Sequence, residues 1–371
     1  MKTLQMQSCV HDNNTIECAL FEVEVPEPGE NEVLIAIEAT PINPSDLGLM
    51  FGAADVDSAR ASERNGHPSV ILDMPAPAMA MMASRINEWL PVGNEAAGKV
   101  VAAGSGEAAQ ALLGKRVGTF GGEMYASHRC VNVQQCLPLP DAVSAEEGAS
   151  CFVNPMTALG FVETMRMEGH KAIVHTAAAS NLGQMLNRIC LDESIPLVNI
   201  VRSEAQVALL KDQGAKHVLN SSDEDFSKQL RAAVTETGAT LAYDAIGGGK
   251  LVNQILMAME AAAQARMPAW SRYGSDEHKQ AYIYGALDLS PTVLNRGYGF
   301  AWSVGGWLLT PFLQRAGGER IQRMQQRVVS ELTTTFASHY AHRVSLETSL
   351  SVEAVKQYGV RRTGQKTLIT F

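Results

Sequence analysis

Hydrophobic and polar residues alternate in short runs along the first part of the chain, a pattern typical of β-strands. The runs are VLIAIEATPIN, PVGNEAAGKVVAAGSG, GKRVGTF and EMYASHRCVNVQQCLPLP. Glycine or proline interrupts them, and many short strands with glycine turns predict a barrel-like β domain. Residues 53–85 differ, because they are rich in Ala, Ser, Asp and Met and contain three prolines. We expect them to form a long, partly helical excursion, of a kind that is often functional or mobile.

The pattern changes near Ser144. The segment SAEEGASCFVNPMTALGFVETM predicts a helix, with Ser144 as its N-cap and Glu147 completing a capping box. Strand candidates follow in AIVHT, PLVNIV, HVLN, ATLAYDAIG and YIYGAL, and amphipathic helical segments separate them. Such repeated β-α units predict a doubly wound parallel sheet. The chain then closes with helix candidates in GERIQRMQQRVVSELTTTF and SVEAVKQYGVRR and a strand in QKTLITF.

Length and charge narrow the class of protein. A chain of 371 residues with 46% hydrophobic and 19% charged residues suits two globular domains. A net charge of -9 argues against nucleic acid or an anionic membrane as the main partner. No apolar run reaches the ~18–20 residues of a membrane helix. The N-terminus does not resemble a signal peptide, so we expect a cytoplasmic protein.

The six cysteines are scattered, with no C-x-x-C pair. We expect isolated thiols rather than a disulfide framework or a structural zinc knuckle.

A candidate phosphate-binding turn follows the first strand of the second half. Residues 172–175 predict a strand, 176–181 a turn of small residues, and a helix follows. Small residues let the backbone approach a pyrophosphate, and a helix N-terminus offers free N–H groups. Of the expected G-x-G-x-x-G only Gly183 matches, with Ala177 and Ser180 in place of the first two glycines. A tight turn without a ligand is the alternative, but the β-α-β context favours a dinucleotide site.

The end of the second strand bears on which dinucleotide binds. An NAD site usually has Asp or Glu here to hold the ribose hydroxyls. This strand ends instead in Arg202 and Ser203, and the first carboxylate is Glu204. A cation and a hydroxyl suit a 2′-phosphate, so the sequence predicts NADPH as the cofactor. The alternative is that Arg202 is a solvated surface cation.

Several ordered motifs together resemble one family. They are NEVLIAIEATPINPSD, PVGNEAAGKVVAAGSG, GKRVGTF, LPLPDAVSAEEGASCFVNPMTAL, QGAKHVLN and TGQKTLITF. In number and order they resemble the medium-chain dehydrogenase/reductase superfamily, specifically its zinc-free quinone oxidoreductase and enoyl reductase-like branch. The resemblance implies an α/β fold with a GroES-like β-barrel domain at residues 1–143 and 338–371. Residues 144–337 would form a Rossmann domain with a doubly wound parallel sheet that binds NADP.

The resemblance also implies which residues contact the cofactor. These residues lie in the first-domain motif, in the helix predicted after Ser144 and in the candidate phosphate-binding turn. Others lie at the ends of two later strands and in the C-terminal strand. The set is Asn43, Thr157, Ala178, Ser180, Asn181, Leu182, Arg202, Ser203, Tyr284, Gly285 and Lys366.

Each of these residues has an implied role. Asn43 would face the nicotinamide or substrate, and Thr157 the nicotinamide ribose and phosphate. Residues 178 and 180–182 would line the pyrophosphate. Arg202 and Ser203 would hold the 2′-phosphate, residues 284 and 285 would lie near the nicotinamide amide, and Lys366 would approach the cofactor. No catalytic acid or base is identified.

Departures from the family pattern restrict the chemistry. Zinc-dependent members have a Cys and a His where this chain has Pro44-Ser45-Asp46 and Gly93-Asn94-Glu95, so we expect no metal. Enoyl reductase relatives place a Tyr where Ala53-Ala54 follows Gly52. Gln206 stands where the branch often has a Lys.

The resulting hypothesis is zinc-independent, NADPH-dependent hydride transfer to a quinone or an activated alkene (enone), which mainly requires positioning and exclusion of water. The alternative is a non-catalytic NADPH-binding or redox-sensing protein. The resemblance further implies a homodimer that forms through edge strands near YIYGAL.

Other residues leave two interpretations open. Tyr298, Phe300, Trp302 and Trp307 either line an apolar substrate pocket or simply pack. Met79, Met81 and Met82 either form a substrate lid or pack within their loop. We expect His175 to be a core histidine and Asp244 a turn or cap residue.

Overall fold

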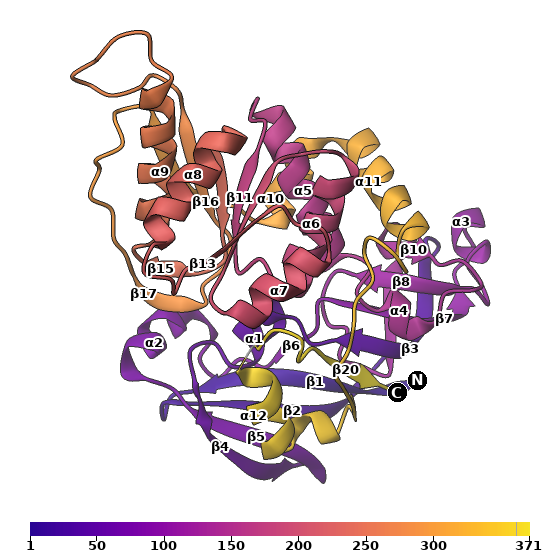
Figure 1. Ribbon diagram of the computed structural model, residues 1–371. Coiled ribbons are helices and arrows are strands. Elements are labelled where there is room, and N and C mark those ends of the chain that lie inside the picture. The colour runs from indigo at the N-terminus through magenta and orange to yellow at the C-terminus, as the bar shows by residue number, and fades with distance from the viewer. Residues whose placement is uncertain (361) are drawn as a thin grey trace. The chain divides into compact units, whose positions relative to one another are not determined.

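The computed structural model describes residues 1–360 and 362–371. It divides into two compact units (Figure 1). The first unit comprises Met1–Val153 and Gln325–Phe371, and the second comprises Asn154–Met324. These boundaries differ from the expected 143/144 and 337/338. Helix α4 (Ala145–Gly148) packs against strands of the first unit, and the second half of α11 (Gly318–Ser330) also belongs to that unit.

The first unit is built from two sheets. One sheet has the strand order β4-β5-β2-β1-β6. Its strands are β1 (Lys2–His11), β2 (Thr15–Glu24), β4 (Asp55–Arg64), β5 (His67–Asp73) and β6 (Leu90–Pro91). The other has the order β10-β8-β7-β3-β20-β19, and β9 also pairs with β3. Its strands are β3 (Glu32–Pro41), β7 (Glu95–Ala103), β8 (Arg116–Phe120), β9 (His128–Asn132), β10 (Cys136–Pro138), β19 (His342–Ser345) and β20 (Thr367–Thr370).

Short helices connect these strands. They are α1 (Pro44–Met50), α2 (Ala76–Met81), α3 (Glu107–Gln110), α4, α12 (Val352–Gly359) and three 3₁₀ turns, η1 (Ala83–Arg85), η2 (Val133–Gln135) and η3 (Thr348–Leu350). The last predicted helix was expected to extend past residue 361, which lies outside the described residues. β20 pairs with β3, so the C-terminal strand returns to the first unit.

The excursion at residues 53–85 is mainly a β-hairpin. Strands β4 and β5 pair antiparallel, and β5 also pairs with β2, so the segment extends a sheet of the first unit. Asn65 and Gly66 form its turn with positive φ angles of 53° and 81°, the conformation that Asn-Gly favours in hairpins. The expectation of a partly helical excursion was therefore wrong over most of its length, and only α2 and the η1 turn are helical.

The second unit contains a six-stranded parallel sheet with the order β13-β12-β11-β14-β16-β18. Its strands are β11 (Ile173–Thr176), β12 (Leu197–Val201), β13 (His217–Asn220), β14 (Leu241–Asp244), β16 (Lys279–Ile283) and β18 (Trp302–Gly306). In order of appearance this is 3-2-1-4-5-6, the doubly wound arrangement of dinucleotide-binding domains. Together with the β-rich first unit, it confirms the predicted fold class.

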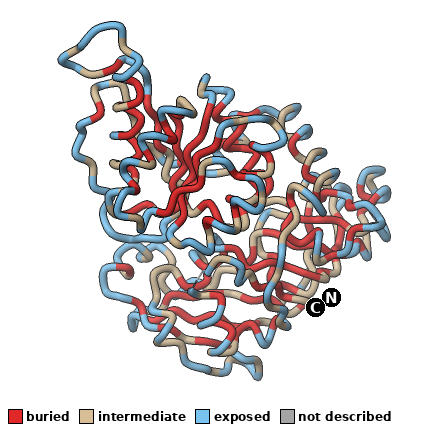
Figure 2. Tube along the Cα trace, viewed as in Figure 1, coloured by how far each residue is buried: buried red, intermediate tan, exposed pale blue. Residues whose placement is uncertain are grey.

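Helices flank this sheet. They are α5 (Val153–Met167), α6 (Asn181–Asp192), α7 (Glu204–Asp212), α8 (Phe226–Thr237), α9 (Leu251–Ala265), α10 (Leu309–Ala316) and the first half of α11. The central strands β11, β12 and β14 are buried at every position, as expected of parallel strands covered on both faces (Figure 2). A separate pair, β15 (Gly247–Gly249) and β17 (Asp288–Thr292), follows the ends of β14 and β16.

The predicted strand YIYGAL is not at an edge of the sheet. It corresponds to β16, which pairs with β14 on one side and β18 on the other. The expectation of edge strands near YIYGAL was therefore wrong in position, because a further strand, β18, follows in the sheet. β18 is the edge strand on this side.

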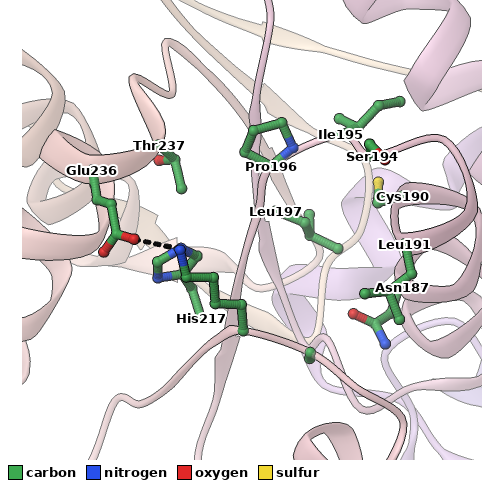
Figure 3. Close-up of a pocket in the computed structure, with 12 residues that line it drawn as sticks. Asn187, Cys190, Leu191, Ser194, Ile195, Pro196, Leu197, His217, Glu236 and Thr237 are labelled. Carbon is green, nitrogen blue, oxygen red and sulfur yellow. Dashed lines mark hydrogen bonds and ion pairs between the residues drawn. The ribbon is translucent and has the colours of Figure 1, made fainter.

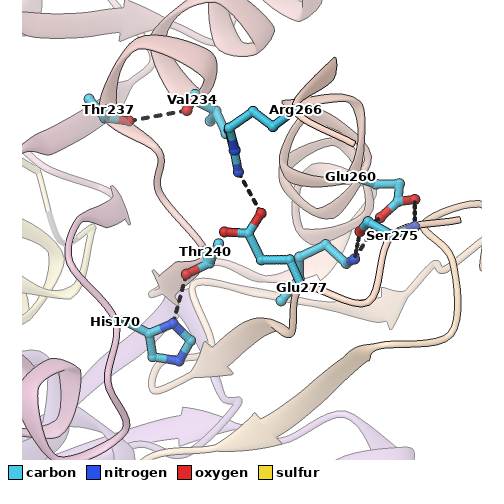
Figure 4. A network of polar contacts seen from close by, with 9 residues as sticks. His170, Val234, Thr237, Thr240, Glu260, Arg266, Ser275 and Glu277 are labelled. Atoms are coloured by element: carbon cyan, nitrogen blue, oxygen red, sulfur yellow. Dashed lines mark hydrogen bonds and ion pairs between the residues drawn. The ribbon is translucent and has the colours of Figure 1, made fainter. Parts of the chain in front are cut away.

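A buried ion pair fixes the segment between α9 and β16. The Lys279 ammonium lies 2.5 Å from the Glu260 carboxylate, and the Lys279 side chain is fully buried. The same carboxylate accepts hydrogen bonds from the Ser275 backbone N–H (2.9 Å) and hydroxyl (2.6 Å) (Figure 4). Residues 266–278 are thus tied to α9 from inside the unit.

The four aromatic residues considered for a substrate pocket differ in burial. Tyr298 and Trp307 are buried, Trp302 packs edge-on against Tyr298, and Phe300 is 83% exposed. Trp307 donates a hydrogen bond to Thr164 and stacks with Phe312. Packing is therefore the better interpretation.

The methionine cluster is likewise divided. Met79 and Met82 pack against the core of the first unit, whereas Met81 is exposed. This favours loop packing over a lid.

Candidate functional site

Two strand ends of the second unit meet where the strand order reverses. Thr176 ends β11 and Asp244 ends β14, and the Thr176 hydroxyl donates a 2.7 Å hydrogen bond to the Asp244 carboxylate. Asp244 also accepts from the Gly247 backbone N–H (2.8 Å), so it is the turn residue that the sequence predicted. Ligands of open α/β sheets bind at this place, outside the carboxyl ends of the strands.

The turn from β11 into α6 is capped and closely packed against the start of the helix. Ser180 is the N-cap of α6, and its hydroxyl accepts a 3.1 Å hydrogen bond from the Gly183 backbone N–H. A β-carbon at Gly183 would overlap the backbone of Ala178, so only glycine allows this close packing of turn and helix. Counted back from Gly183, the first glycine position is Ala178 rather than Ala177. Ala177 instead carries a positive φ of 49°.

The structure brings the four predicted pyrophosphate residues together in this one turn. Ala178 and Leu182 are buried, while Ser180 and Asn181 are partly exposed. The N–H groups in the first turn of a helix have no partner within that helix and lie at its positive end. The backbone of α6, more than any side chain, is therefore suited to hold an anion.

The end of β12 presents an exposed cation. The side chain of Arg202 is exposed, and its guanidinium forms no ion pair among residues 1–360 and 362–371. Glu204, the first carboxylate after the strand, accepts a 2.8 Å hydrogen bond from Asn220. The Gln206 side chain accepts from the backbone N–H of Arg202 (3.1 Å) and fixes the turn. Ser203 is the N-cap of α7, but its hydroxyl makes no cap hydrogen bond.

Tyr284 and Gly285 lie at the end of β16. The Tyr284 hydroxyl lies 2.8 Å from Nε2 of His175, and their rings stack. Burial lowers the pKa of His175 to about 3, so its imidazole is neutral and behaves as the expected core histidine. Gly285 approaches the backbone of Ala245 so closely that a β-carbon would stand 2.6 Å from its carbonyl oxygen. Thr157 lies on α5 and is buried.

The two predicted residues of the first unit, Asn43 and Lys366, belong to one polar cluster around Glu95. The fully buried Glu95 carboxylate accepts from the Asn43 amide (2.8 Å) and from the backbone N–H groups of Phe152 (2.8 Å) and Val153 (2.9 Å). Lys366 donates a 2.7 Å hydrogen bond to the Ser150 hydroxyl.

Burial and neighbouring charges perturb the titration of this cluster. Burial raises the pKa of Glu95, against the opposing effect of the Lys366 charge. Burial lowers the pKa of Lys366 to about 8, although Glu95 and Asp46 favour its charged form. Burial likewise raises the pKa of Asp46 to about 7. A cluster with several shifted titratable groups is a candidate functional site.

Sequence reasoning missed four members of this cluster, one of which is Tyr340, whose hydroxyl lies 2.8 Å from Ser150 Oγ. Glu95 and Asp46 were noted only as parts of motifs that lack the zinc ligands, and Ser150 and Tyr340 were not considered. Ser150 and Lys366 are 216 residues apart in sequence, so no local pattern could have joined them.

A surface pocket of about 270 Å³ lies elsewhere on the second unit (Figure 3). It is lined by the starts of β12 and β13 and the C-terminal ends of α6 and α8, with Leu197, His217, Cys190 and Thr237 among its walls. It therefore lies at the amino edge of the parallel sheet, opposite the phosphate turn, and is not the predicted site.

Two kinds of feature are absent from the described part of the chain. No group of three or more His, Cys, Asp or Glu side chains there is arranged to hold a metal ion. No helix there is long and apolar enough to cross a membrane.

No family model matches the chain. Among curated proteins it is 27% identical over 241 residues to a mitochondrial enoyl-[acyl-carrier-protein] reductase of Caenorhabditis elegans, covering 62% of this chain and 60% of that one. It also matches polyketide synthases, of which it spans about a tenth of the length.

Solved structures match the whole chain. A protein of Mesorhizobium loti, provisionally assigned as an NADPH:quinone reductase, superposes with a TM-score of 0.74 at 24% identity, covering 100% of this chain and 98% of that one. The Escherichia coli quinone oxidoreductase complexed with NADPH gives 0.70 at 17% identity, covering 99% and 100%. The chain thus has the fold of these reductases, and the resemblance predicted from its motifs is confirmed at that level.

Proposed function

We propose that this chain is an NADPH-dependent oxidoreductase. The observation that carries the proposal is Arg202, an exposed cation with no acidic partner in the described chain, at the end of the strand that follows the phosphate turn. An NAD-specific site would offer a carboxylate to the ribose hydroxyls, but Glu204 is engaged with Asn220. A guanidinium beside the unused Ser203 hydroxyl matches a 2′-phosphate.

The residues of the second unit fit the rest of this cofactor. The α6 N-terminus with Ala178, Ser180, Asn181 and Leu182 would hold the pyrophosphate. Thr157 would contact the nicotinamide ribose and phosphate, and Tyr284 and Gly285 would lie near the nicotinamide amide. When bound, NADPH supplies a hydride for transfer to an electron-poor carbon. The E. coli protein of the same fold is complexed with NADPH, which supports the choice of cofactor.

We infer that the substrate is a quinone or an activated alkene. Relatives and structural neighbours with this fold are described as quinone reductases or enoyl reductases. Asn43 and Lys366 would serve the nicotinamide or substrate from the first unit. The reaction would proceed without zinc, since Pro44-Ser45-Asp46 and Gly93-Asn94-Glu95 stand where zinc-dependent members of the resembled family have their Cys and His. The Asn94 amide donates a 3.1 Å hydrogen bond to the Ser45 hydroxyl.

Turnover tests this proposal. Steady-state oxidation of NADPH should be measured with a panel of quinones and enones, with NADH as the matched control cofactor. We expect turnover with at least one acceptor and a clear preference for NADPH. Tight NADPH binding without turnover of any acceptor would contradict the proposal and favour the non-catalytic alternative.

Two further properties remain proposals. A homodimer would form through β18, since its sequence WSVGG carries no charge or proline to block pairing with a second copy. Sedimentation velocity of the wild-type protein and a Val304→Lys variant would test this. The cytoplasmic location is proposed from the sequence alone.

A further inference from the structure

Three exposed aromatic side chains lie on two neighbouring loops of the second unit. Trp270 and Tyr273 belong to the loop between α9 and β16, and Phe300 belongs to the loop that leads into β18. Trp270 is 87% exposed, Phe300 83% and Tyr273 58%. The rings of Tyr273 and Phe300 meet edge-on with 6.2 Å between their centroids, so the two loops share one surface. This surface of Trp270, Tyr273 and Phe300 is called the aromatic tip below. Large apolar side chains that gather in water mark a binding surface.

The loops under the aromatic tip are anchored from inside the unit. Gly274 and Gly299 have positive φ angles of 79° and 68°. A β-carbon on Gly274 would stand 2.8 Å from the Cα atom of Gly299 and 2.5 Å from Oε1 of Glu260, so only glycine lets the loops cross here. The Glu260 carboxylate in turn holds Ser275 and Lys279 (Figure 4). The aromatic side chains are therefore exposed on a fixed framework.

The aromatic tip lies at the amino edge of the parallel sheet. Both of its loops precede strands, β16 and β18, whereas the phosphate turn follows β11 at the carboxyl edge. Figure 1 shows the loop after α9 projecting beyond the end of that helix. The three residues before Trp270 are Met-Pro-Ala, which add apolar surface and no charge. A partner can therefore reach the aromatic tip without covering the carboxyl edge of the sheet.

Arginines accompany these rings, although the whole chain has a net charge of -9. Residues 261–275 contain two arginines and no acid, and residues 289–306 contain one arginine and no acid. The guanidinium of Arg272 lies over the Tyr273 ring, 4.7 Å from its centroid, and Arg296 is exposed. The local charge is thus opposite in sign to that of the chain.

Two acidic residues follow on the return of the first loop. The Glu277 carboxylate accepts a 2.5 Å hydrogen bond from Arg266, and Asp276 is exposed (Figure 4). Together they offset two of the three arginine charges. Because Arg266 is engaged by Glu277, the cations beside the aromatic rings are Arg272 and Arg296.

A phospholipid surface fits this combination. Trp and Tyr rings favour the interface between acyl chains and water, and Arg side chains are attracted to anionic headgroups. A specific protein interface typically needs about 800 Å² from each partner. Three rings on two loops offer instead a narrow contact that a soft bilayer can surround.

We propose that the aromatic tip docks the second unit on bilayers that contain anionic phospholipids. Trp270 and Phe300 enter the interface, and Arg272 and Arg296 face the headgroups. The remainder of the chain is acidic and is repelled by such a bilayer, so the docking is weak and reversible. The proposal is independent of the proposed oxidoreductase activity.

The direct test is cosedimentation with vesicles, either of phosphatidylcholine alone or of phosphatidylcholine with phosphatidylserine. We expect wild type to bind the phosphatidylserine vesicles more tightly, and less so as salt increases. Trp270→Ser/Phe300→Ser should bind roughly tenfold more weakly, because two large apolar side chains no longer enter the bilayer. Met81→Ser removes an 85% exposed apolar side chain of the first unit and should match wild type.

The arginines have a readout of their own. Arg272→Ala and Arg296→Ala should each bind phosphatidylserine vesicles about fivefold more weakly, the usual effect of one cation near an anionic surface, and bind phosphatidylcholine unchanged. The matched control is Arg231→Ala, an exposed arginine on α8, which should behave as wild type with both vesicles.

Fluorescence reports the insertion itself. The emission of Trp270 should move to shorter wavelength on phosphatidylserine vesicles and should be quenched by brominated acyl chains. Trp270→Phe keeps an aromatic ring, so this variant should still bind vesicles but lack the Trp270 signal. Circular dichroism and thermal unfolding of every variant establish that the fold is retained.

Three results would overturn the proposal. They are a wild-type protein that binds neither vesicle, a double variant that binds as tightly as wild type, and a Trp270 emission that vesicles leave unchanged. Self-association of wild type that the double variant lacks, without vesicle binding, would assign the aromatic tip to a contact between copies instead. None of these measurements uses NADPH oxidation, so their failure is distinguishable from a failure of the proposed function.

Discussion

Gly183 packs directly against Ala178, so closely that a β-carbon on Gly183 would overlap the Ala178 carbonyl oxygen. This contact sets the distance between the phosphate turn and helix α6. It also explains why Gly183 is the one position of the G-x-G-x-x-G motif at which this chain has glycine. The first two glycine positions, Ala178 and Ser180, tolerate small side chains in this structure.

Gly183→Ala should therefore displace the turn from the helix. We expect a destabilisation of about 1–3 kcal/mol, the usual cost of overpacking, together with weaker NADPH binding. Gly318→Ala is the matched control, because a β-carbon there meets nothing within 4 Å and φ is unexceptional. Urea unfolding and fluorescence titration with NADPH measure both effects. Equal stability and affinity in the two variants would contradict the assigned contact.

The low pKa of His175 predicts that the folded protein loses stability in acid. Burial lowers this pKa from the ordinary value of 6.5 to about 3 in the folded chain. Between these values the unfolded chain binds a proton that the folded chain does not, so stability falls as pH decreases from 6.5 towards 3. His175→Gln, whose amide can still bond to Tyr284, should flatten this dependence. Denaturant unfolding between pH 4 and 7 measures how the free energy of unfolding depends on pH. The same dependence in wild type and His175→Gln would contradict the low pKa of His175.

The raised pKa of Asp46 predicts the opposite pH dependence of stability over an overlapping range. Burial raises its pKa from 3.8 to about 7, so the folded chain binds this proton more tightly than the unfolded chain. Its contribution to stability is complete below pH 3.8 and is lost as pH rises through 7. Asp46→Asn should lose less stability than wild type between pH 5 and 8, and the exposed Asp141→Asn should behave as wild type. Parallel curves for all three proteins would show that Asp46 is not perturbed.

Variants of Lys279 and Glu260 test how much the buried ion pair contributes to stability. Lys279→Met leaves the Glu260 carboxylate buried without its cation, which typically costs about 3–5 kcal/mol. The double variant Lys279→Met/Glu260→Leu removes both charges and should recover much of that loss. Urea unfolding compares the three proteins, and a double variant no more stable than Lys279→Met would contradict this account.

The sequence predicted the parallel sheet of the second unit well, for a physical reason. Buried parallel strands are short, continuous apolar runs, and the helices between them have strong amphipathic periodicity. β11, β12, β13 and β14 all lie within predicted strands. β18 was not predicted, because WSVGG ends in two glycines, which are unfavourable in strands.

Other features depended on signals that were weaker or not local. The Asn65-Gly66 turn was present in the sequence, but the polar edge strand β4 before it has no regular alternation. The cluster of Asn43, Glu95 and Lys366 depends on chain segments brought together by folding. Its hydrogen bonds span 52 and 216 residues, beyond the reach of any periodic pattern.

The central claim is that Arg202 selects NADPH through its 2′-phosphate. Equilibrium titrations of wild type, Arg202→Ala and the exposed control Arg231→Ala with NADPH and with NADH test it most directly. Losing a charge-assisted contact worth about 1.5–3 kcal/mol should weaken NADPH binding by Arg202→Ala roughly 10–150-fold and leave NADH binding within about twofold. Arg231→Ala should match wild type with both cofactors. Equal losses of NADPH and NADH affinity in Arg202→Ala, or no loss of either, would contradict the claim.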